Sequence, residues 1–137
     1  MQIFERGDSC IATDLFLYEL KPVEDLPMLL SFSMNFPEEL RSTRILVNVL
    51  KFLVKLCHKN QSIFAGYHST SNENFMRFYI YTRKERSGLT EAITARAQQL
   101  GLHVDHVQFE EDENWQTYMN YLYPTQREFC SIISRRM

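Results

Sequence analysis

Hydrophobic and polar residues alternate most regularly between Met28 and Phe36, where every second side chain is large and apolar. A period of two residues is typical of a β-strand with one buried face. Phe75–Arg83 alternates in the same way, and Ser62–Ser69 and Leu102–Phe109 are strand-length segments with several β-branched or aromatic residues. The sequence therefore predicts four core strands.

Two other segments have helical spacing. A helix is expected to open at Pro37, because proline suits the first turn and the two acids after it favour the positive end of the helix dipole. Polar residues then recur every three or four positions as far as Lys59, opposite a broad apolar face. A second helix is predicted from Ser87, as N-cap, to Leu100, with Gly101 as its stop.

These elements follow one another from Leu26 onward in the order β-α-β-β-α-β. That order is typical of an α+β fold, the ferredoxin-like sandwich, in which two helices cover one face of an antiparallel sheet. An apolar segment, Ser9–Leu20, predicts an extra N-terminal strand. We expect residues 1–137 to form a single domain, with a ferredoxin-like core at 26–110 and a C-terminal helical extension at 111–137.

The C-terminal extension contains two short helical patterns. Asp112 is suited to cap the first helix, which has one apolar face and stops at Pro124. That face consists of Trp115, Tyr118, Met119 and Leu122. Thr125 and Glu128 have the spacing of a capping box, which predicts a last helix that extends through Ile133.

Composition narrows the classes of protein that fit this chain. Of its 137 residues, 45% are hydrophobic and 13% are aromatic, which excludes a disordered chain. A formal net charge of −2 gives little general attraction for nucleic acid. The charge is uneven, because Leu102–Asn114 holds five acids without Lys or Arg, whereas Arg77–Arg86 holds four bases. Local electrostatic recognition of a partner therefore remains open.

The cysteines and the apolar segments indicate a cytoplasmic protein. Cys10, Cys57 and Cys130 have no metal-binding or redox spacing, and we expect reduced thiols. The N-terminal residues lack the apolar core of a signal peptide. The most apolar segment, Ile45–Cys57, is shorter than the roughly 20 residues that cross a bilayer, so we expect no contact with a membrane.

No motif for catalysis or cofactor binding is present in the sequence. The chain lacks a glycine-rich phosphate loop, a nucleophile elbow and zinc-ligand spacing. His103, Asp105 and His106 have metal-binding side chains, but on a regular strand His106 points away from the other two, so convergence requires a bulge. The sequence predicts no catalytic residue, no metal and no cofactor, and it favours a protein that is not an enzyme.

The outward side of Phe75–Arg83 interleaves aromatic and basic residues. RNA-binding sheets stack bases on such faces. Here the glycine pattern of those sheets is absent, and the terminal segments need a surface to pack on, so the helix with Trp115 could cover this face. The candidate binding residues on these two elements are Arg77, Tyr79, Tyr81, Arg83, Trp115 and Tyr118.

The segment Glu111–Glu128 contains adjacent acids closely followed by a tryptophan, a tyrosine three residues later and then Leu-Tyr-Pro. This order resembles the C-terminal signature of the bacterial domain-of-unknown-function family 695. Ile63–Tyr67 and Met76–Tyr81 are similar to the family's second and third core strands, so the resemblance covers Leu26–Glu128. It implies a ferredoxin-like fold. Some members are joined to a domain similar to the ribonuclease E activity regulator B, which implies a regulatory, protein-binding role.

The sequence supports three hypotheses about function. The first is a non-catalytic cytoplasmic module that binds another protein, or a second copy of itself, through an aromatic surface or an exposed sheet edge. The second is a small-ligand-binding domain or an enzyme, with Arg77, Tyr79, Tyr81 and a histidine around a site between the sheet and the C-terminal helices. The third is an RNA-binding sheet. The surplus of aromatic residues without a catalytic motif favours the first, and nucleic acid is disfavoured.

Overall fold

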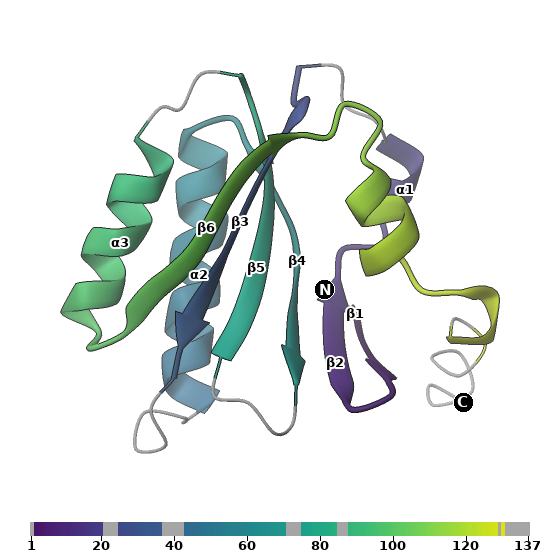
Figure 1. Cartoon of the computed structure of the whole chain (residues 1–137), viewed down its shortest axis with the longest axis horizontal. Helices are drawn as coiled ribbons and strands as arrows, with labels where there is room; N and C mark the ends of the chain where they lie inside the picture. Colours follow the sequence, from purple (N-terminus) through teal and green to yellow (C-terminus); the bar gives the residue numbers. More distant parts are fainter. Residues whose placement is uncertain are drawn as a thin grey trace.

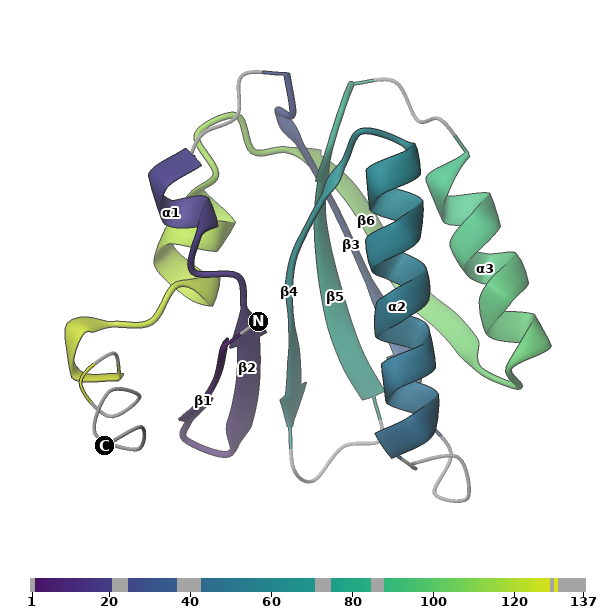
Figure 2. The same ribbon diagram turned by 180° about the vertical axis from the view of Figure 1, so that it is seen from behind.

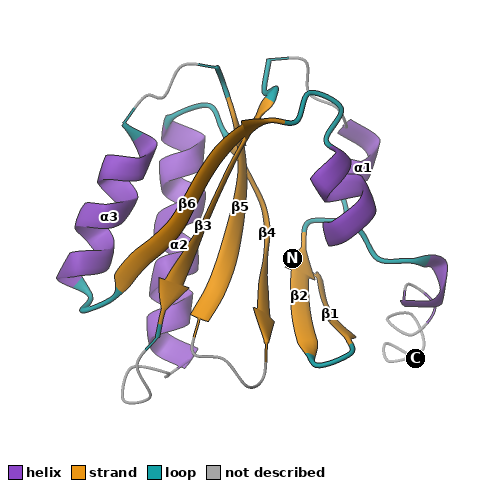
Figure 3. Ribbon diagram, in the orientation of Figure 1, coloured by secondary structure: helices purple, strands orange, loops and turns teal. Residues whose placement is uncertain are grey.

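The computed structural model describes residues 2–20, 25–36, 43–70, 75–84, 88–128 and 130. These residues form one six-stranded sheet in the order β1-β2-β4-β5-β3-β6, in which neighbouring strands are antiparallel (Figure 1, Figure 3). The strands are β1 (Gln2–Arg6), β2 (Ser9–Thr13), β3 (Met28–Asn35), β4 (Ile63–Thr70), β5 (Phe75–Thr82) and β6 (His103–Glu111). The helices are α1 (Leu17–Leu20), α2 (Thr43–Lys59), α3 (Leu89–Gln99) and a π-helical turn, η2 (Tyr118–Leu122).

The helices α2 and α3 cover one face of the sheet, which we call the helix face (Figure 2). Leu30, Phe32 and Met34 of β3 are buried there, as their alternation predicts. Leu53 of α2 and Ile93 of α3 pack in the same core and are almost completely buried. Burying one such side chain contributes about 1.5–3 kcal/mol, so this core holds both helices on the sheet.

The opposite face, which we call the tail face, is covered by α1 and by the chain after β6 (Figure 1). Leu29 of β3 and Ile11 of β2 point to this side and are fully buried. Tyr118 and Leu122 of η2 pack in the same cluster. The sheet therefore has a separate core on each of its faces.

The N-terminal region differs from the prediction of one extra strand. Ser9–Leu20 divides into β2 and α1, and a further strand, β1, precedes it, so a hairpin extends the sheet beyond β4. The sequence does not predict β1, because only Ile3 and Phe4 of its five residues are apolar. The hairpin lies close to β4, where a Cβ at Gly66 would collide with the carbonyl oxygen of Ala12. The strand order is therefore not that of a simple ferredoxin-like sheet.

The ends of α3 agree in part with those predicted from the sequence. Gly101 adopts a left-handed conformation with φ of 74°, which confirms the predicted stop. The residue before the helix is Gly88, which offers no side-chain cap. Ser87, the predicted cap, lies outside the described residues, as do Pro37–Glu39 at the predicted start of the first helix and, in the predicted last helix, residues 129 and 131–133.

Candidate functional site

Three of the six candidate binding residues meet in the core of the tail face. The rings of Tyr81 and Trp115 are stacked, with centroids 4.1 Å apart and an interplanar angle of 12°. Tyr118 meets Trp115 edge-on at 6.0 Å. All three side chains are 0% exposed. Aromatic pairs of this kind contribute about 0.5–1.5 kcal/mol beyond the area they bury. The segment with Trp115 thus covers the aromatic side of β5.

Hydrogen bonds fix the same rings in place. The Tyr81 hydroxyl donates to Oδ2 of Asp112 at 2.7 Å and accepts the N–H of Tyr118 at 3.1 Å. Trp115 Nε1 donates to the carbonyl oxygen of Leu26 at 3.0 Å. A buried polar group without a partner costs about 1–3 kcal/mol, so these bonds are what make polar rings tolerable in a core. We refer to Tyr81, Asp112, Trp115 and Tyr118 as the aromatic latch.

Asp112 also caps the helical turn after β6, as predicted. Its carboxylate accepts the N–H of Gln116 at 2.8 Å and the N–H of Thr117 at 3.0 Å. The helix begins after Trp115 and does not include it, in contrast to the prediction, because Trp115 has a left-handed backbone with φ of 54°. This conformation costs a bulky residue about 1–3 kcal/mol. The packing and hydrogen bonds of the latch offset that strain.

The chain after β6, which we call the tail, is joined to the first strand by a charged pair. Arg6 of β1 donates twice to Glu128, from Nε to Oε2 and from Nη2 to Oε1, both at 2.9 Å. Its Nη1 donates to the carbonyl oxygen of Tyr121 at 2.8 Å. The hydrogen bonds from Arg6 lower the pKa of Glu128 to about 2. Thr125 and Glu128 exchange side-chain-to-backbone hydrogen bonds, which confirms the predicted capping box.

The buried phenol and thiol groups stay protonated at neutral pH. Burial raises the pKa of Tyr79, Tyr81 and Tyr118 well above the usual range of a phenol, and for Tyr81 the bond to Asp112 adds to the effect. Burial also raises the pKa of Cys57, on the helix face, to about 12. These hydroxyl and thiol groups are therefore suited to hold structure, because a base or nucleophile needs a pKa nearer to neutrality.

Arg77, the fourth candidate residue, reaches across the sheet from β5. Its Nη1 donates to Oγ of Ser33 at 3.1 Å and to the carbonyl oxygen of His106 at 3.0 Å. Its Nη2 donates to Oγ of Ser31 at 2.7 Å and to Oε1 of Gln108 at 2.9 Å. Both serines are buried. Arg77 therefore ties β5 to β3 and to β6.

β6 is bulged at the point that Arg77 contacts. Between Ser31 and Ser33 the pairing with β6 shifts by one residue, and His106 has a left-handed φ of 51°. The bulge required for a metal site in this strand is thus present. Nε2 of His106 lies 3.7 Å from Oδ2 of Asp105, with both side chains mostly exposed. Within the described ranges, however, no three His, Cys, Asp or Glu side chains gather as a metal site requires.

The other two candidate residues lie apart from the latch. Tyr79 is buried, and its ring lies 5.9 Å from that of Tyr121. Arg83 follows the end of β5 and is exposed. The structure therefore gathers Tyr81, Trp115 and Tyr118 and leaves Arg83 outside the group.

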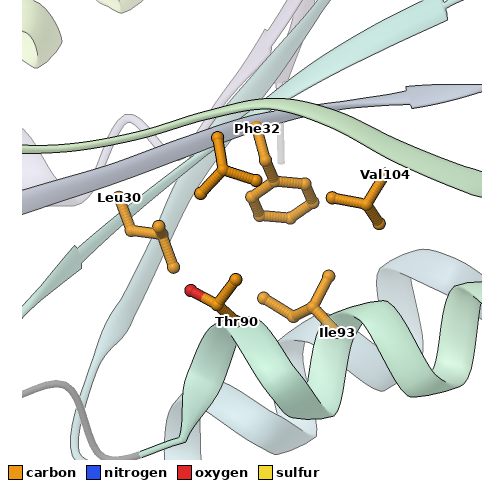
Figure 4. A pocket seen from close by; sticks show the side chains of 6 residues that line it. Leu30, Phe32, Thr90, Ile93 and Val104 are labelled. Atoms are coloured by element: carbon orange, nitrogen blue, oxygen red, sulfur yellow. The ribbon is translucent and has the colours of Figure 1, made fainter.

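A narrow pocket, too small to admit a water molecule, lies on the helix face between α3 and the strands β3 and β6 (Figure 4). It is lined by Leu30, Phe32, Thr90, Ile93, Val104 and Val107. Its lining holds one polar side chain and no acid, base or metal ligand. The second hypothesis places its ligand site on the opposite face, between the sheet and the C-terminal helices. There the latch rings pack against one another and are fully buried.

The feature that sequence patterns do not locate is the edge position of β6. This strand pairs with β3 and with no other strand of the described chain. It has nine residues, seven of them exposed, whereas the strand at the other edge, β1, has five residues. It contains Asp105, Glu110 and Glu111 but neither Lys nor Arg. An edge strand presents backbone N–H and C=O groups to which a further strand can bond.

Comparisons with known proteins place the chain in one group. Residues 7–123 match DUF695, a family of unknown function. The match begins in the turn of the N-terminal hairpin and ends one residue after η2, so it includes a region that the resemblance over Leu26–Glu128 leaves out. Comparison with curated proteins and with solved structures gave no match. No described helix is long and apolar enough to cross a membrane.

Proposed function

This chain belongs to DUF695, a family of unknown function, and we propose that it is a non-catalytic protein-binding module with a regulatory role. Its binding surface is the edge of β6, along which an extended segment of a partner protein adds as a further strand. The main support for this proposal is a contrast between two parts of the molecule. The latch rings of Tyr81, Trp115 and Tyr118 pack inside the molecule, whereas the long, exposed β6 has one neighbouring strand in the described part of the chain.

The edge is suited to binding because it is held from behind. Arg77 holds the middle of the strand through His106 and Gln108. The latch holds its end through Asp112, whose N–H donates to the carbonyl oxygen of Pro27 at 2.8 Å. A strand that is already ordered loses less conformational entropy when a partner binds. We therefore assign positioning roles to Arg77, Tyr81, Trp115 and Tyr118.

The charge of β6 favours one kind of partner. Pairing two copies through this edge would bring Asp105, Glu110 and Glu111 of each copy near the same carboxylates of the other, and facing like charges are unfavourable. A strand with Lys or Arg at alternate positions forms favourable pairs instead. We therefore propose a basic segment of another protein in preference to a second copy.

The fold classification and location form part of the same proposal. The unit β3-α2-β4-β5-α3-β6 is ferredoxin-like, and the hairpin and tail are added to it. Support comes from its strand order, β4-β5-β3-β6, and from the shared position of α2 and α3 on one face. The cysteine pattern supports a cytoplasmic location.

A peptide-binding experiment tests this function. A peptide of alternating Lys and Val is added to isotopically labelled protein, and amide NMR shifts and hydrogen exchange are followed. We expect shifts and new protection along His103–Glu111. A peptide of alternating Glu and Val is the control, and it should bind at least about tenfold more weakly because its charge has the wrong sign.

Charge reversal in the protein completes the test. Glu110→Lys combined with Glu111→Lys should weaken binding of the Lys-Val peptide, whereas Asp8→Lys, exposed in the β1–β2 turn, should not. Circular dichroism and the unfolding midpoint verify that each variant is folded. Equal binding of the two peptides, or shifts that avoid β6, would refute an edge-binding role.

A further inference from the structure

The outer side of α2 carries positive charge without a counter-charge on the same helix. Thr43–Lys59 contains four Lys or Arg residues and no Asp or Glu. The four are Arg44, Lys51, Lys55 and Lys59, and all are exposed. The ion pair of Arg6 with Glu128 and the contact of Asp105 with His106 both lie elsewhere in the described structure. The described part of the molecule thus leaves this helix face unneutralised.

Two exposed apolar side chains lie among these bases. Val47 is 40% exposed and Val54 is 54% exposed. Val49, Leu53 and Cys57 on the opposite side of α2 pack in the core, so the helix cannot turn these two valines inward. The outer face therefore combines basic and apolar groups at helical spacing.

This arrangement has an energetic cost in the isolated protein. Lys51, Lys55 and Lys59 are spaced four residues apart, and like charges at that spacing destabilise a helix by about 0.2–0.5 kcal/mol per pair. An acidic surface placed against the helix would remove this repulsion and cover the valines at the same time.

We propose that the outer face of α2 is a second docking surface, which binds an acidic, amphipathic segment of a partner protein. Carboxylates of that segment pair with the lysines, and its apolar side chains pack on Val47 and Val54. The surface is distinct from β6, because α2 contacts β4 whereas α3 contacts β6 (Figure 2). Its test is therefore independent of the function proposed above.

Other anionic partners fit this face less well. A phosphate backbone would neutralise the lysines and leave Val47 and Val54 in water, and the chain as a whole has a net charge of −2. An anionic membrane binds helices that insert a large apolar face, and two valines bury little area. A protein interface combines an apolar centre with a polar rim, and the two valines beside the lysines can supply both.

Binding of designed peptides tests the α2 surface in the full chain. The probe is a helical peptide with Glu and Leu on one face, and the control replaces each Leu by Ser. We expect the Glu-Leu peptide to shift amides of α2 and to bind more weakly as salt is raised. Lys51→Glu with Lys55→Glu should reduce its affinity at least about tenfold.

Matched variants make the outcome decisive. Lys84→Glu with Arg127→Glu changes the same charge at exposed positions outside α2 and should alter affinity less than about twofold. Val54→Ser should weaken binding of the Glu-Leu peptide and leave binding of the Glu-Ser peptide unchanged. If circular dichroism shows that the Lys51→Glu, Lys55→Glu variant does not fold, the variant Lys51→Gln, Lys55→Gln takes its place.

Several results would overturn the assignment. These are equal binding of the Glu-Leu and Glu-Ser peptides, or no binding of either. Binding of polyuridylate or of phosphatidylserine vesicles to α2, without binding of the peptides, would assign the face to nucleic acid or to a membrane. Dimerisation in sedimentation experiments that is lost in the Lys51→Glu, Lys55→Glu variant would assign it to a second copy.

Discussion

The two faces of the sheet are both covered, but by different physical means. On the helix face, α2 and α3 bury side chains such as Phe32 and Phe78, whose contacts have little directional requirement. On the tail face, hydrogen bonds fasten the rings to atoms far away in sequence. The hydroxyl of Tyr118, for example, donates to the carbonyl oxygen of Asp14 at 2.7 Å.

Because of this difference, the two faces should tolerate different substitutions. Apolar cores accept changes that conserve volume, commonly for less than about 1.5 kcal/mol. A directed bond that is lost leaves a buried partner unsatisfied, even when the shape of the side chain is kept. Removing a single hydroxyl group should therefore distinguish the tail face from the helix face.

The largest effect is expected for Trp115→Ala. Emptying a fully buried indole site should cost about 3–5 kcal/mol, because the stacking on Tyr81 and the bond to Leu26 are both lost. Urea unfolding followed by circular dichroism measures the change. Phe16→Ala, at a side chain that is 81% exposed, is the control and should stay within about 0.5 kcal/mol. Unchanged stability of Trp115→Ala would show that the tail face closes without its indole.

Tyr81→Phe compares the two faces directly. It should cost about 2 kcal/mol, because Asp112 Oδ2 and the N–H of Tyr118 each lose a partner. Tyr67→Phe makes the same chemical change on the helix face, where Tyr67 is buried, and should cost less than about 0.5 kcal/mol. Unfolding free energies of the two variants give the answer. Equal costs would mean that directed bonds do not distinguish the faces.

Arg77→Met should have a smaller global effect, about 1–2 kcal/mol, because the buried hydroxyls of Ser31 and Ser33 lose their donor. Its local effect should be clear in hydrogen exchange, which we expect to accelerate around His106. Arg127→Met, at an exposed position, is the control. Unchanged exchange in the bulge would show that another contact holds β6.

Glu128→Gln should have the smallest effect, about 1 kcal/mol at pH 7, because the pair with Arg6 is partly exposed. The pKa of Glu128 falls from an ordinary 4.5 to about 2 on folding, so the wild type has this stability in full above pH 4.5. It loses the contribution as the pH falls from 4.5 through 2. Unfolding free energies over that range should converge for the two proteins, and a constant difference would contradict the assignment.

The helix face could be predicted from sequence because its information is local. The alternation of β3 and the spacing of α2 specify which side chains point into this core. The prediction that β3 has only one buried face is wrong, because Leu29, Ser31 and Ser33 on its other side are buried too. The cap at Asp112, the stop at Gly101 and the capping box at Thr125 are also local, since each involves atoms only a few residues apart.

The tail face could be predicted only in outline. Alternation places Tyr79 and Tyr81 on the outer side of β5, but it does not say whether solvent or a distant segment covers that side. The bond from Trp115 to Leu26 spans 89 residues, and no local pattern encodes it. The bulge in β6 depends likewise on pairing with β3, and β1 has too few apolar residues to be recognised.

The contact between Arg6 and Glu128 joins positions that are 122 residues apart. During synthesis the β1–β2 hairpin leaves the ribosome well before Tyr118 and Leu122, which cover its inner side. Until the tail has been synthesised, Phe4 and Ile11 of the nascent hairpin are therefore exposed, and exposed apolar side chains favour binding to chaperones or aggregation. Completion of the tail is the event that ends this exposure.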